Sequence, residues 1–361
     1  MKTSRPFFSA LYRSFLQRRR SVCWAVVSAM LLPFSLLYLL AVTCLRLFLR
    51  PRRYPFLVVG VGNLTAGGTG KTTLVEIIVR NLFRKFTRVV VVSSGIGSRG
   101  STLLAPGRLA RDPSQFGDEV VLLARKLPGT LFVKGKSKHR LVEIVARQTE
   151  PDAVVIDDAL QSYHIKKDVE IALLDALNPF DNGFLLPAGL LRDLPIRLRR
   201  VEVIILTNSR LLPAQEKDTL IKRLKGYHRP VFSMNYREAG ITERSGKTFP
   251  GNFLFGKDIL AFAGIGQPFS FFALVREMQP RRLFTVAYPD HYCYQPQDVV
   301  ELVALGERLG VDCWLMTEKD AVKVWRLDPP EKFMCLRIAA FFEDEKGREV
   351  AIDNLLRNFI E

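Results

Sequence analysis

Residues 56–73 read FLVVGVGNLTAGGTGKTT, and the order of residue types in this stretch decides the fold. An apolar run passes into a glycine-rich turn that ends at Gly70-Lys71-Thr72, after which apolar residues recur at helical spacing. Strand, glycine loop and helix are the setting of a phosphate-binding loop, because the loop amides and the helix N-terminus both attract phosphate oxygens. The strict loop pattern has glycine where this chain has Thr65. A chance glycine turn is the alternative, and the flanking strand and helix argue against it.

The positive charge of the chain is concentrated at its N-terminus. The net charge is +17 over 361 residues, yet residues 1–53 hold ten Lys or Arg and no acid, and the first carboxylate is Glu76. This basic segment also contains the most apolar part of the sequence, which favours anionic lipid over nucleic acid as its partner. We therefore expect no nucleic acid among the partners. The weaker basic surplus of the remaining chain suits a polyanionic substrate.

Between Arg20 and Arg46 lie 25 uncharged residues that are rich in Leu, Val, Phe and Ala. As a helix they would extend over about 37 Å, enough to cross a hydrocarbon core of ~30 Å. Pro33 falls inside this run, so the segment is predicted either as a kinked span or as two halves that enter one leaflet. A buried helical hairpin of a soluble protein is the alternative. We favour membrane attachment, with the rest of the chain in the cytoplasm if it uses ATP.

Strand patterns alternate with helical patterns through the rest of the chain. This alternation predicts an α/β protein with a doubly wound parallel sheet of the P-loop NTPase type. A loop rich in Gly, Ser and Pro is expected over residues 95–115. The pattern restarts near Pro230, which predicts a second, smaller α/β domain. The expected organisation is a membrane-associated helical segment (1–53), a P-loop domain (54–214), a polar joint (215–229) and a C-terminal α/β domain (230–361).

Carboxylates and a histidine follow several of the predicted strands. One strand ends in Asp157 and Asp158, at the sheet edge where ligands of open parallel sheets bind, so either could hold Mg²⁺. As surface residues that cap a helix, the two would need no function. Asp118 can reach the same edge, or it serves only as a helix N-cap. His291 could orient or protonate a partner, although a satisfied surface histidine is the more common case.

Together these motifs resemble those of the tetraacyldisaccharide 4'-kinase family, the membrane-bound lipid A kinases of Gram-negative bacteria. Their order and spacing, over nearly the whole chain, make the resemblance specific. The matching stretches are VGNLTAGGTGKT (61–72), GDE (117–119), IDDALQ (156–161), NGFLLPAGLLRD (182–193), AGIGQPFSFF (263–272), PDHY (289–292) and TEKDAVK (317–323). The last stretch also faintly resembles the guanine-reading motif of GTPases, but its lysine is out of place.

The resemblance implies a role for each matching site residue. Lys71 would bind the β- and γ-phosphates, and Arg192 would help to neutralise the developing charge. Asp118 is implied as the catalytic base, with His291 as its partner. The implied ATP loop comprises Thr65, Ala66, Gly67, Gly68, Thr69, Gly70, Lys71 and Thr72. The implied Mg²⁺ ligands are Thr72, Asp157, Asp158 and Asp193, where Asp193 stands in place of a glutamate.

Two motifs depart from the family pattern. The family usually has Ser-Arg-Gly-Tyr-Gly after its second strand, whereas this chain has Ser-Ser-Gly-Ile-Gly at 93–97, and Arg99 or Arg108 is the expected substitute. The family's Asp-Asp-Gly-Phe-Gln-His reads Asp-Asp-Ala-Leu-Gln-Ser at 157–162, with His164 two residues further on. The chain is therefore expected to be a divergent member.

The predicted activity is phosphorylation, with ATP and Mg²⁺, of the 4'-hydroxyl of a tetraacylated glucosamine disaccharide 1-phosphate in lipid A biosynthesis. The expected partners are this lipid precursor and membrane lipids. We expect a monomer at the bacterial inner membrane, with its catalytic body on the cytoplasmic side. A membrane-recruited P-loop ATPase of the partitioning or targeting type is one alternative, but such proteins need a lysine near the start of the loop. A non-catalytic nucleotide-binding membrane protein is the other.

Overall fold

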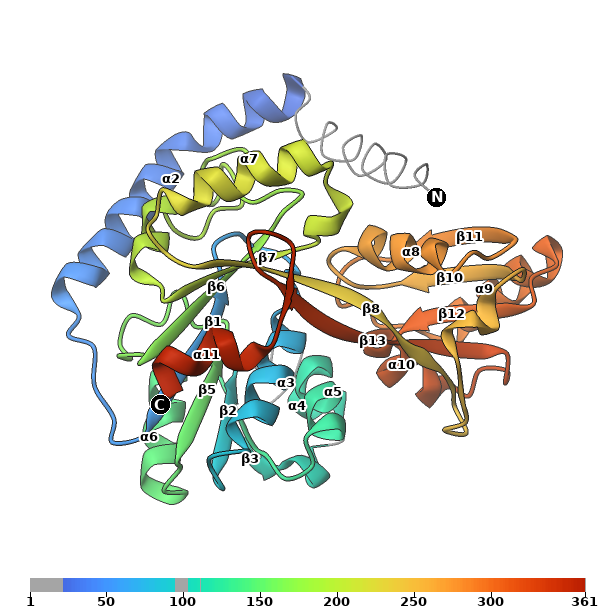
Figure 1. The fold of residues 1–361 in the computed structure, drawn as a ribbon, viewed down its shortest axis with the longest axis horizontal. Helices are drawn as coiled ribbons and strands as arrows, with labels where there is room; N and C mark the ends of the chain where they lie inside the picture. The colour runs from blue at the N-terminus through green and yellow to red at the C-terminus, as the bar shows by residue number, and fades with distance from the viewer. Residues whose placement is uncertain (1–21, 95–102, 111, 361) are drawn as a thin grey trace.

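Most of the strands form two parallel blocks within one continuous sheet (Figure 1). The structure, a computed structural model, describes residues 22–94, 103–110 and 112–360. The first block consists of β1 (Leu57–Asn63), β2 (Val89–Ser93), β4 (Leu131–Lys134), β5 (Ala153–Asp157), β6 (Val169–Asp175) and β7 (Val203–Thr207). The second block consists of β10 (Asp258–Ala263), β11 (Arg282–Ala287) and β12 (Cys313–Thr317). At the outer edge of the first block, β3 (Leu103–Pro106) pairs antiparallel with β4.

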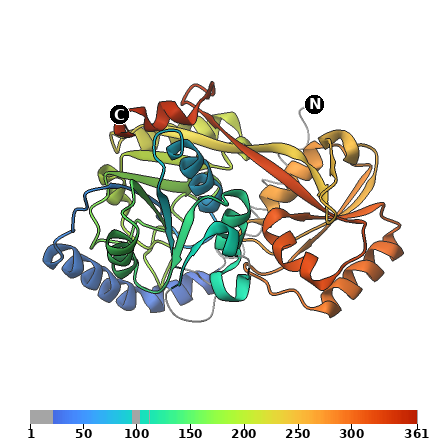
Figure 2. The ribbon, with the colours of Figure 1, turned by 90° about the horizontal axis from the view of Figure 1, so that it is seen from below.

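Two long strands, β8 (Val231–Glu243) and β13 (Phe333–Glu343), join the blocks as an antiparallel ribbon. The start of β8 pairs parallel with β7, and the start of β13 pairs parallel with β12. The short strands β9 (Thr248–Phe249) and β14 (Glu349–Val350) pair with the ribbon. The full order is β11-β10-β12-β13-β8-β7-β6-β1-β5-β2-β4-β3. Because β8 and β13 run in opposite directions, the C-terminal strand ends of one block face those of the other. Figure 2 shows this ribbon of β8 and β13 passing from one block to the other.

The N-terminal body consists of the first block and the helices that cover its two faces. Val59 and Val61 pack toward α3 (Lys71–Leu82) and α5 (Asp118–Lys126), while Val58 packs toward α6 (Lys138–Gln148) on the other face. This alternation is the period of two that a strand imposes on its side chains. The C-terminal body consists of the second block with α8 (Pro268–Glu277), α9 (Pro296–Leu309) and α10 (Glu318–Val324). The structure also contains α4 (Pro113–Phe116), α7 (Ala214–Lys225) and α11 (Ile352–Ile360).

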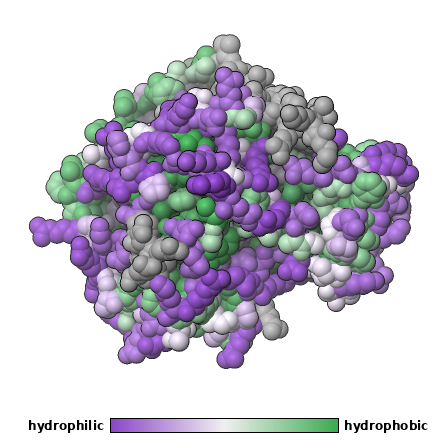
Figure 3. Space-filling model, viewed as in Figure 1, coloured by the Kyte–Doolittle hydropathy of each residue, from purple (hydrophilic) through white to green (hydrophobic). Residues whose placement is uncertain are grey.

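The helix α2 (Val22–Phe48) lies along the outside of the N-terminal body and continues through Pro33 as one helix (Figure 1). One side of α2 packs against the body, where Tyr38 and Leu39 join a core cluster. The segment Ala25–Phe48 has the length and composition of a membrane-crossing helix. Figure 3 shows hydrophobic surface along the edge that α2 forms. Its outward residues recur at helical spacing and are each at least half exposed: Met30, Phe34, Leu37, Leu45 and Phe48.

The predicted α/β class with a mostly parallel sheet is confirmed, but the structure differs from the sequence-based expectation in two segments. Within the expected loop, β3 is followed by a 3₁₀ turn, because the Gly107 amide donates to the Thr130 carbonyl at 2.8 Å and holds this segment beside β4. The expected polar joint is mostly α7, whose Ile221 and Leu224 are buried. The two bodies are therefore connected through the paired strands β8 and β13.

Gly306 of α9 packs against the indole of Trp314 in β12, and an added Cβ would lie 2.2 Å from a ring atom. We predict that Gly306→Ala lowers the free energy of unfolding by about 1–3 kcal/mol, because overpacking outweighs the helix propensity that alanine adds. Gly129→Ala is the matched control, since nothing lies within 4 Å of its added Cβ. Urea unfolding of the full chain in detergent measures both variants, and equal stability would contradict the prediction.

Candidate active site

The glycine loop between β1 and α3 is held in shape by a residue of the strand before it. Gly67 has φ 129° and Gly70 has φ 81°, values that favour glycine. The Asn63 amide donates to the carbonyls of Thr65 and Gly67 at 2.6 and 3.0 Å. Lys71 begins α3, so the positive end of the helix closes the loop. This arrangement is that of a phosphate-binding loop.

Three cations surround the carboxylate of Asp158, which directly follows β5. Arg192 donates from Nη1 and Nη2 to Oδ1 and Oδ2 at 2.6 and 3.1 Å. Lys138 Nζ lies 3.6 Å from Oδ2, and Lys71 Nζ lies 3.9 Å from Oδ1. Burial raises the pKa of Asp158, but the three positive charges outweigh burial and lower the pKa to about 2. The structure thus concentrates positive charge beside the glycine loop, where a polyphosphate would need it.

Three buried oxygens near this edge have no hydrogen-bond partner among the described residues: Asp157 Oδ1, Thr69 Oγ1 and Gln161 Oε1. Burial raises the pKa of Asp157, and the negative charge of Glu119 adds to the effect. Buried polar atoms without a partner are rare, because each one costs free energy. A carboxylate oxygen left open at this position fits a hard divalent cation. Thr72, in the first turn of α3, is a second candidate oxygen ligand.

Asp118 and His291 meet across the junction of the two bodies. Asp118 begins α5 and is 7% exposed. His291 follows β11, and its Nδ1 lies 3.3 and 3.2 Å from the two carboxylate oxygens of Asp118. The two residues are 173 positions apart in sequence. They are neighbours because the strand ends of the two blocks face each other, and the predicted pair is thus brought together in the structure.

Two lysines of α10 complete this group. Lys319 Nζ lies 3.4 Å from His291 Nε2 and 3.2 Å from Glu119 Oε1, and Lys323 Nζ donates to Asp118 Oδ2 at 3.5 Å. Burial raises the pKa of Asp118, but the hydrogen bond from His291 and the charges of the lysines outweigh it and lower the pKa well below its usual value. The hydrogen bond to Asp118 raises the pKa of His291, against burial and the charge of Lys319. Asp118 is therefore ionised at neutral pH.

The backbones of the two bodies touch at the glycine loop. A Cβ added to Gly266 would lie 2.8 Å from the nitrogen of Gly68, so this approach requires glycine. Beside it, Gln267 Nε2 donates to Asp175 Oδ2 at 2.7 Å, and Asn208 Nδ2 donates to Gln267 Oε1 at 2.5 Å. Asp175 ends β6 and is buried. These bonds fix the loop after β10 against the C-terminal ends of β6 and β7.

Comparisons with known proteins agree with this geometry. The family model described as tetraacyldisaccharide-1-P 4'-kinase matches residues 27–357. A tetraacyldisaccharide 4'-kinase of Pelobacter propionicus is 35% identical over 354 residues, which cover 94% of this chain and 95% of that protein. One from Geobacter metallireducens is 35% identical and covers 83% of this chain and 88% of that protein. The chain belongs to the tetraacyldisaccharide 4'-kinase family. The resemblance expected from the motifs is confirmed, and membership makes the chain an ATP-dependent kinase of lipid A biosynthesis.

A solved structure shares the fold of this chain. It is LpxK from Aquifex aeolicus, crystallised as an "apo" form in complex with ATP. The match has a TM-score of 0.67 at 24% identity and covers 93% of this chain and 100% of that chain. The shared fold extends through both bodies and the ribbon that joins them.

The structure places Asp193 differently from the other predicted site residues. Its Oδ1 accepts from the Leu194 amide at 2.7 Å, and its Oδ2 accepts from Arg46 and from the Tyr163 hydroxyl, the latter at 3.0 Å. Arg46 belongs to α2. Both carboxylate oxygens of Asp193 therefore have protein partners, whereas Arg192, the preceding residue, turns toward Asp158.

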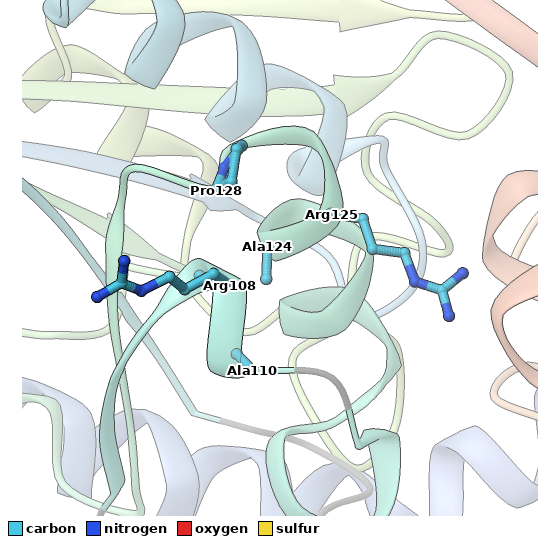
Figure 4. A pocket seen from close by; sticks show the side chains of 6 residues that line it. Arg108, Ala110, Ala124, Arg125 and Pro128 are labelled. Carbon is cyan, nitrogen blue, oxygen red and sulfur yellow. The ribbon is translucent and has the colours of Figure 1, made fainter.

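Arg108, one of the residues expected to replace the missing family motifs, lies apart from the dyad of Asp118 and His291. Arg99 and residues 95–97 lie outside the described residues. Arg108 lines a cavity of about 440 Å³ at the C-terminal end of α5, with Gly107, Ala110, Ala124, Arg125 and Pro128. Figure 4 shows the side chains of Arg108 and Arg125 pointing away from each other. Asp118 begins α5 at its opposite end. His164 stacks on His139, with ring centroids 5.3 Å apart.

Four side chains of the site were missed by sequence reasoning: Asn63, Lys138, Lys319 and Lys323. Lys138 follows β4 in a stretch without a motif, and the one available signal was that parallel strands end at a common edge. Lys319 and Lys323 lie four residues apart, a spacing that places both on one helix face, within a stretch that matches the family. Their partners, Glu119 and Asp118, could be identified only from the structure, in which the two blocks face each other.

The contact with Asp118 makes stability depend on pH through His291. Because the folded-state pKa of His291 lies above its ordinary 6.5, its contribution is fully present below that pH and is lost as pH rises through the folded-state pKa. We predict that His291→Gln lowers the free energy of unfolding more at about pH 6 than at about pH 9. Urea unfolding at both pH values measures the difference. Equal losses for His291→Gln at the two pH values would contradict the assignment.

Proposed function

We propose that this chain transfers the γ-phosphoryl group of ATP to the 4'-hydroxyl of a tetraacylated glucosamine disaccharide 1-phosphate. The observation that carries the proposal is the contact between Asp118 and His291 at the edge that also holds the glycine loop. Glu119, the neighbour of Asp118, is close enough to Asp157 for its charge to raise the Asp157 pKa. We therefore treat the dyad and the three cations around Asp158 as parts of one site. The activity named for the family agrees with this reading.

The triphosphate binds in the glycine loop, residues 65–72. The amides of the loop and of the first turn of α3 bind the phosphate oxygens. Lys71, Lys138 and Arg192 then neutralise charge on the transferring group, which is the main requirement of phosphoryl transfer. In support, these three side chains already converge on one carboxylate, Asp158. A phosphate group that binds these three side chains takes the place of the Asp158 carboxylate as their anionic partner.

Thr72 and Asp157 are the residues that would hold Mg²⁺. The unpartnered Oδ1 of Asp157 supports this choice, as does the position of Thr72 in the first turn of α3. Bound there, the ion would supply further charge neutralisation at the phosphates. Asp158 and Asp193, implied as additional ligands by the family resemblance, have cationic partners of their own. We therefore assign the ion to Thr72 and Asp157.

Asp118 accepts the proton of the attacking hydroxyl. Its low pKa keeps it ionised, and a loose transition state needs orientation of the hydroxyl more than a strong base. His291 donates from Nδ1 to the carboxylate, and Lys319 faces the other ring nitrogen, Nε2. Together the two side chains fix the orientation of Asp118. Lys323 compensates the buried charge from the other side.

The apolar side of α2 supports a location of the site at a membrane surface. Met30, Phe34 and Leu37 are exposed on that side, and the N-terminal segment is strongly basic. Apolar burial combined with attraction to anionic lipid binds such helices to bilayers. We assign the chain to the bacterial inner membrane, with both bodies on the cytoplasmic side where ATP is available. The acyl chains of the substrate then remain in the bilayer while its sugar enters the site, and one copy of the chain suffices.

Asp118→Asn tests the assignment of the base, because it keeps the size of the side chain and removes its charge. We predict that kcat falls by about 10²–10⁴-fold while ATP binding is retained. The assay follows label from [γ-³²P]ATP into the disaccharide 1-phosphate lipid. Asp218→Asn, at an exposed position of α7, is the matched control and should keep full activity. Full activity of Asp118→Asn would refute its role as base.

The same assay on the unaltered chain separates the candidate activities. Transfer of label to the lipid supports the kinase. Release of phosphate without labelled lipid would instead indicate the membrane-recruited ATPase. Neither product, in a chain that binds ATP, would indicate a nucleotide-binding protein without catalysis.

A further inference from the structure

A short connecting segment, residues 190–193, links the glycine loop to the outside of the N-terminal body. The Ala66 amide donates to the Leu190 carbonyl at 2.8 Å, and the Arg192 amide donates to the Leu64 carbonyl at 2.9 Å. The connecting segment thus pairs with the start of the glycine loop as an added strand would. From this segment the Arg192 side chain reaches Asp158. Any shift of the connecting segment would therefore move both the guanidinium of Arg192 and the first residues of the glycine loop.

The other side of the connecting segment is bound to α2. The Tyr38 hydroxyl donates to the Arg192 carbonyl at 2.9 Å. Arg46 forms an ion pair with Asp193, whose side chain is 2% exposed. Arg46 also donates to the Tyr163 hydroxyl at 3.0 Å and lies over the Tyr163 ring, 4.7 Å from its centroid. The guanidinium is thus held by a carboxylate, a hydroxyl and an aromatic face.

We propose that Arg46 of α2 is a positioning residue for Arg192, and that the helix facing the membrane is thereby part of the scaffold of the catalytic site. The inference rests on the proposed role of Arg192 at the phosphates. A buried carboxylate requires a partner, and Arg46 supplies it for Asp193. Because Asp193 is the next residue after Arg192, fixing its carboxylate fixes the backbone from which the Arg192 side chain extends.

Without Arg46, the Asp193 carboxylate would turn toward the cation that remains near it. That cation is Arg197, whose Nε lies 3.9 Å from Asp193 Oδ2. The turn would displace the connecting segment and with it Arg192. A displacement of about 1 Å at a positioning residue can cost a hundredfold in rate. The loss should appear in kcat, because Arg192 acts on charge that develops during transfer.

The test measures kcat and KM of the full chain in mixed micelles with the disaccharide 1-phosphate lipid. We expect Arg46→Met to lower kcat about ten- to a hundredfold with KM for ATP nearly unchanged, and Arg46→Lys to restore part of the loss. Arg192→Met should lower kcat at least as much. The double variant Arg46→Met/Arg192→Met should be no slower than Arg192→Met alone, because both changes act through one guanidinium. Arg308→Met, which removes an exposed charge of α9 in the other body, should leave kcat unchanged.

Several outcomes would overturn the inference. If Arg46→Met kept full kcat while Arg192→Met lost it, or if the two losses multiplied in the double variant, Arg46 would not act through Arg192. If Arg192→Met itself kept full kcat, the role of Arg192 would fail, and the inference with it, while labelling of the lipid would still support the kinase. Should Arg46→Met not fold, Tyr38→Phe decides, since it removes only the hydroxyl bond to the Arg192 carbonyl. We expect it to lower kcat several-fold, and an unchanged kcat would contradict the proposal.

Discussion

The antiparallel pairing of β8 with β13 is the constraint on which the rest of the structure depends. In a parallel sheet the ligand-binding edge is the one at which the strands end. A single parallel block has one such edge, open to solvent. Here the ribbon turns the second block around, so that its C-terminal edge faces that of the first. One block then supplies the glycine loop and Asp118, and the other supplies His291 and Lys319.

Charges of opposite sign lie together in two parts of the site. Lys71, Lys138 and Arg192 would repel one another at close range if Asp158 did not lie between them. The Asp158 carboxylate thus forms with these cations the interactions that a bound phosphate group would form. Asp118 lies in the converse arrangement, an anion held by His291 and by lysines of α10. Both groups of side chains are therefore preorganised, which limits the rearrangement needed when substrates bind.

How far the sequence could predict this site depends on the range of each interaction. The glycine loop and the strand that ends in Asp157 are local patterns, so their positions followed from residue spacing alone. Asp118 and His291 were candidates from their positions in the chain, but their roles as a pair came only through family resemblance, because nothing local distinguishes them from a helix cap and a surface histidine. The contact between Gly68 and Gly266 could not be predicted, because it depends on the relative orientation of the two blocks. The ion pair between Asp193 and Arg46 was missed for the same reason, since it joins segments that are far apart in the chain.

The polar contacts of α2 also decide how the chain can sit in a bilayer. Ser35 donates to the Leu185 carbonyl at 2.9 Å and accepts from the Ala188 amide at 3.1 Å, and Tyr38 bonds to the Arg192 carbonyl. A transmembrane orientation would separate α2 from the N-terminal body and break these bonds. The hydroxyls of α2 would then be unpaired in hydrocarbon, and the backbone groups of the body would lose their partners. With the bonds intact, only one side of the helix can enter lipid. In the proposed membrane-bound state, such a helix would enter a single leaflet, and the chain would leave it again without unfolding.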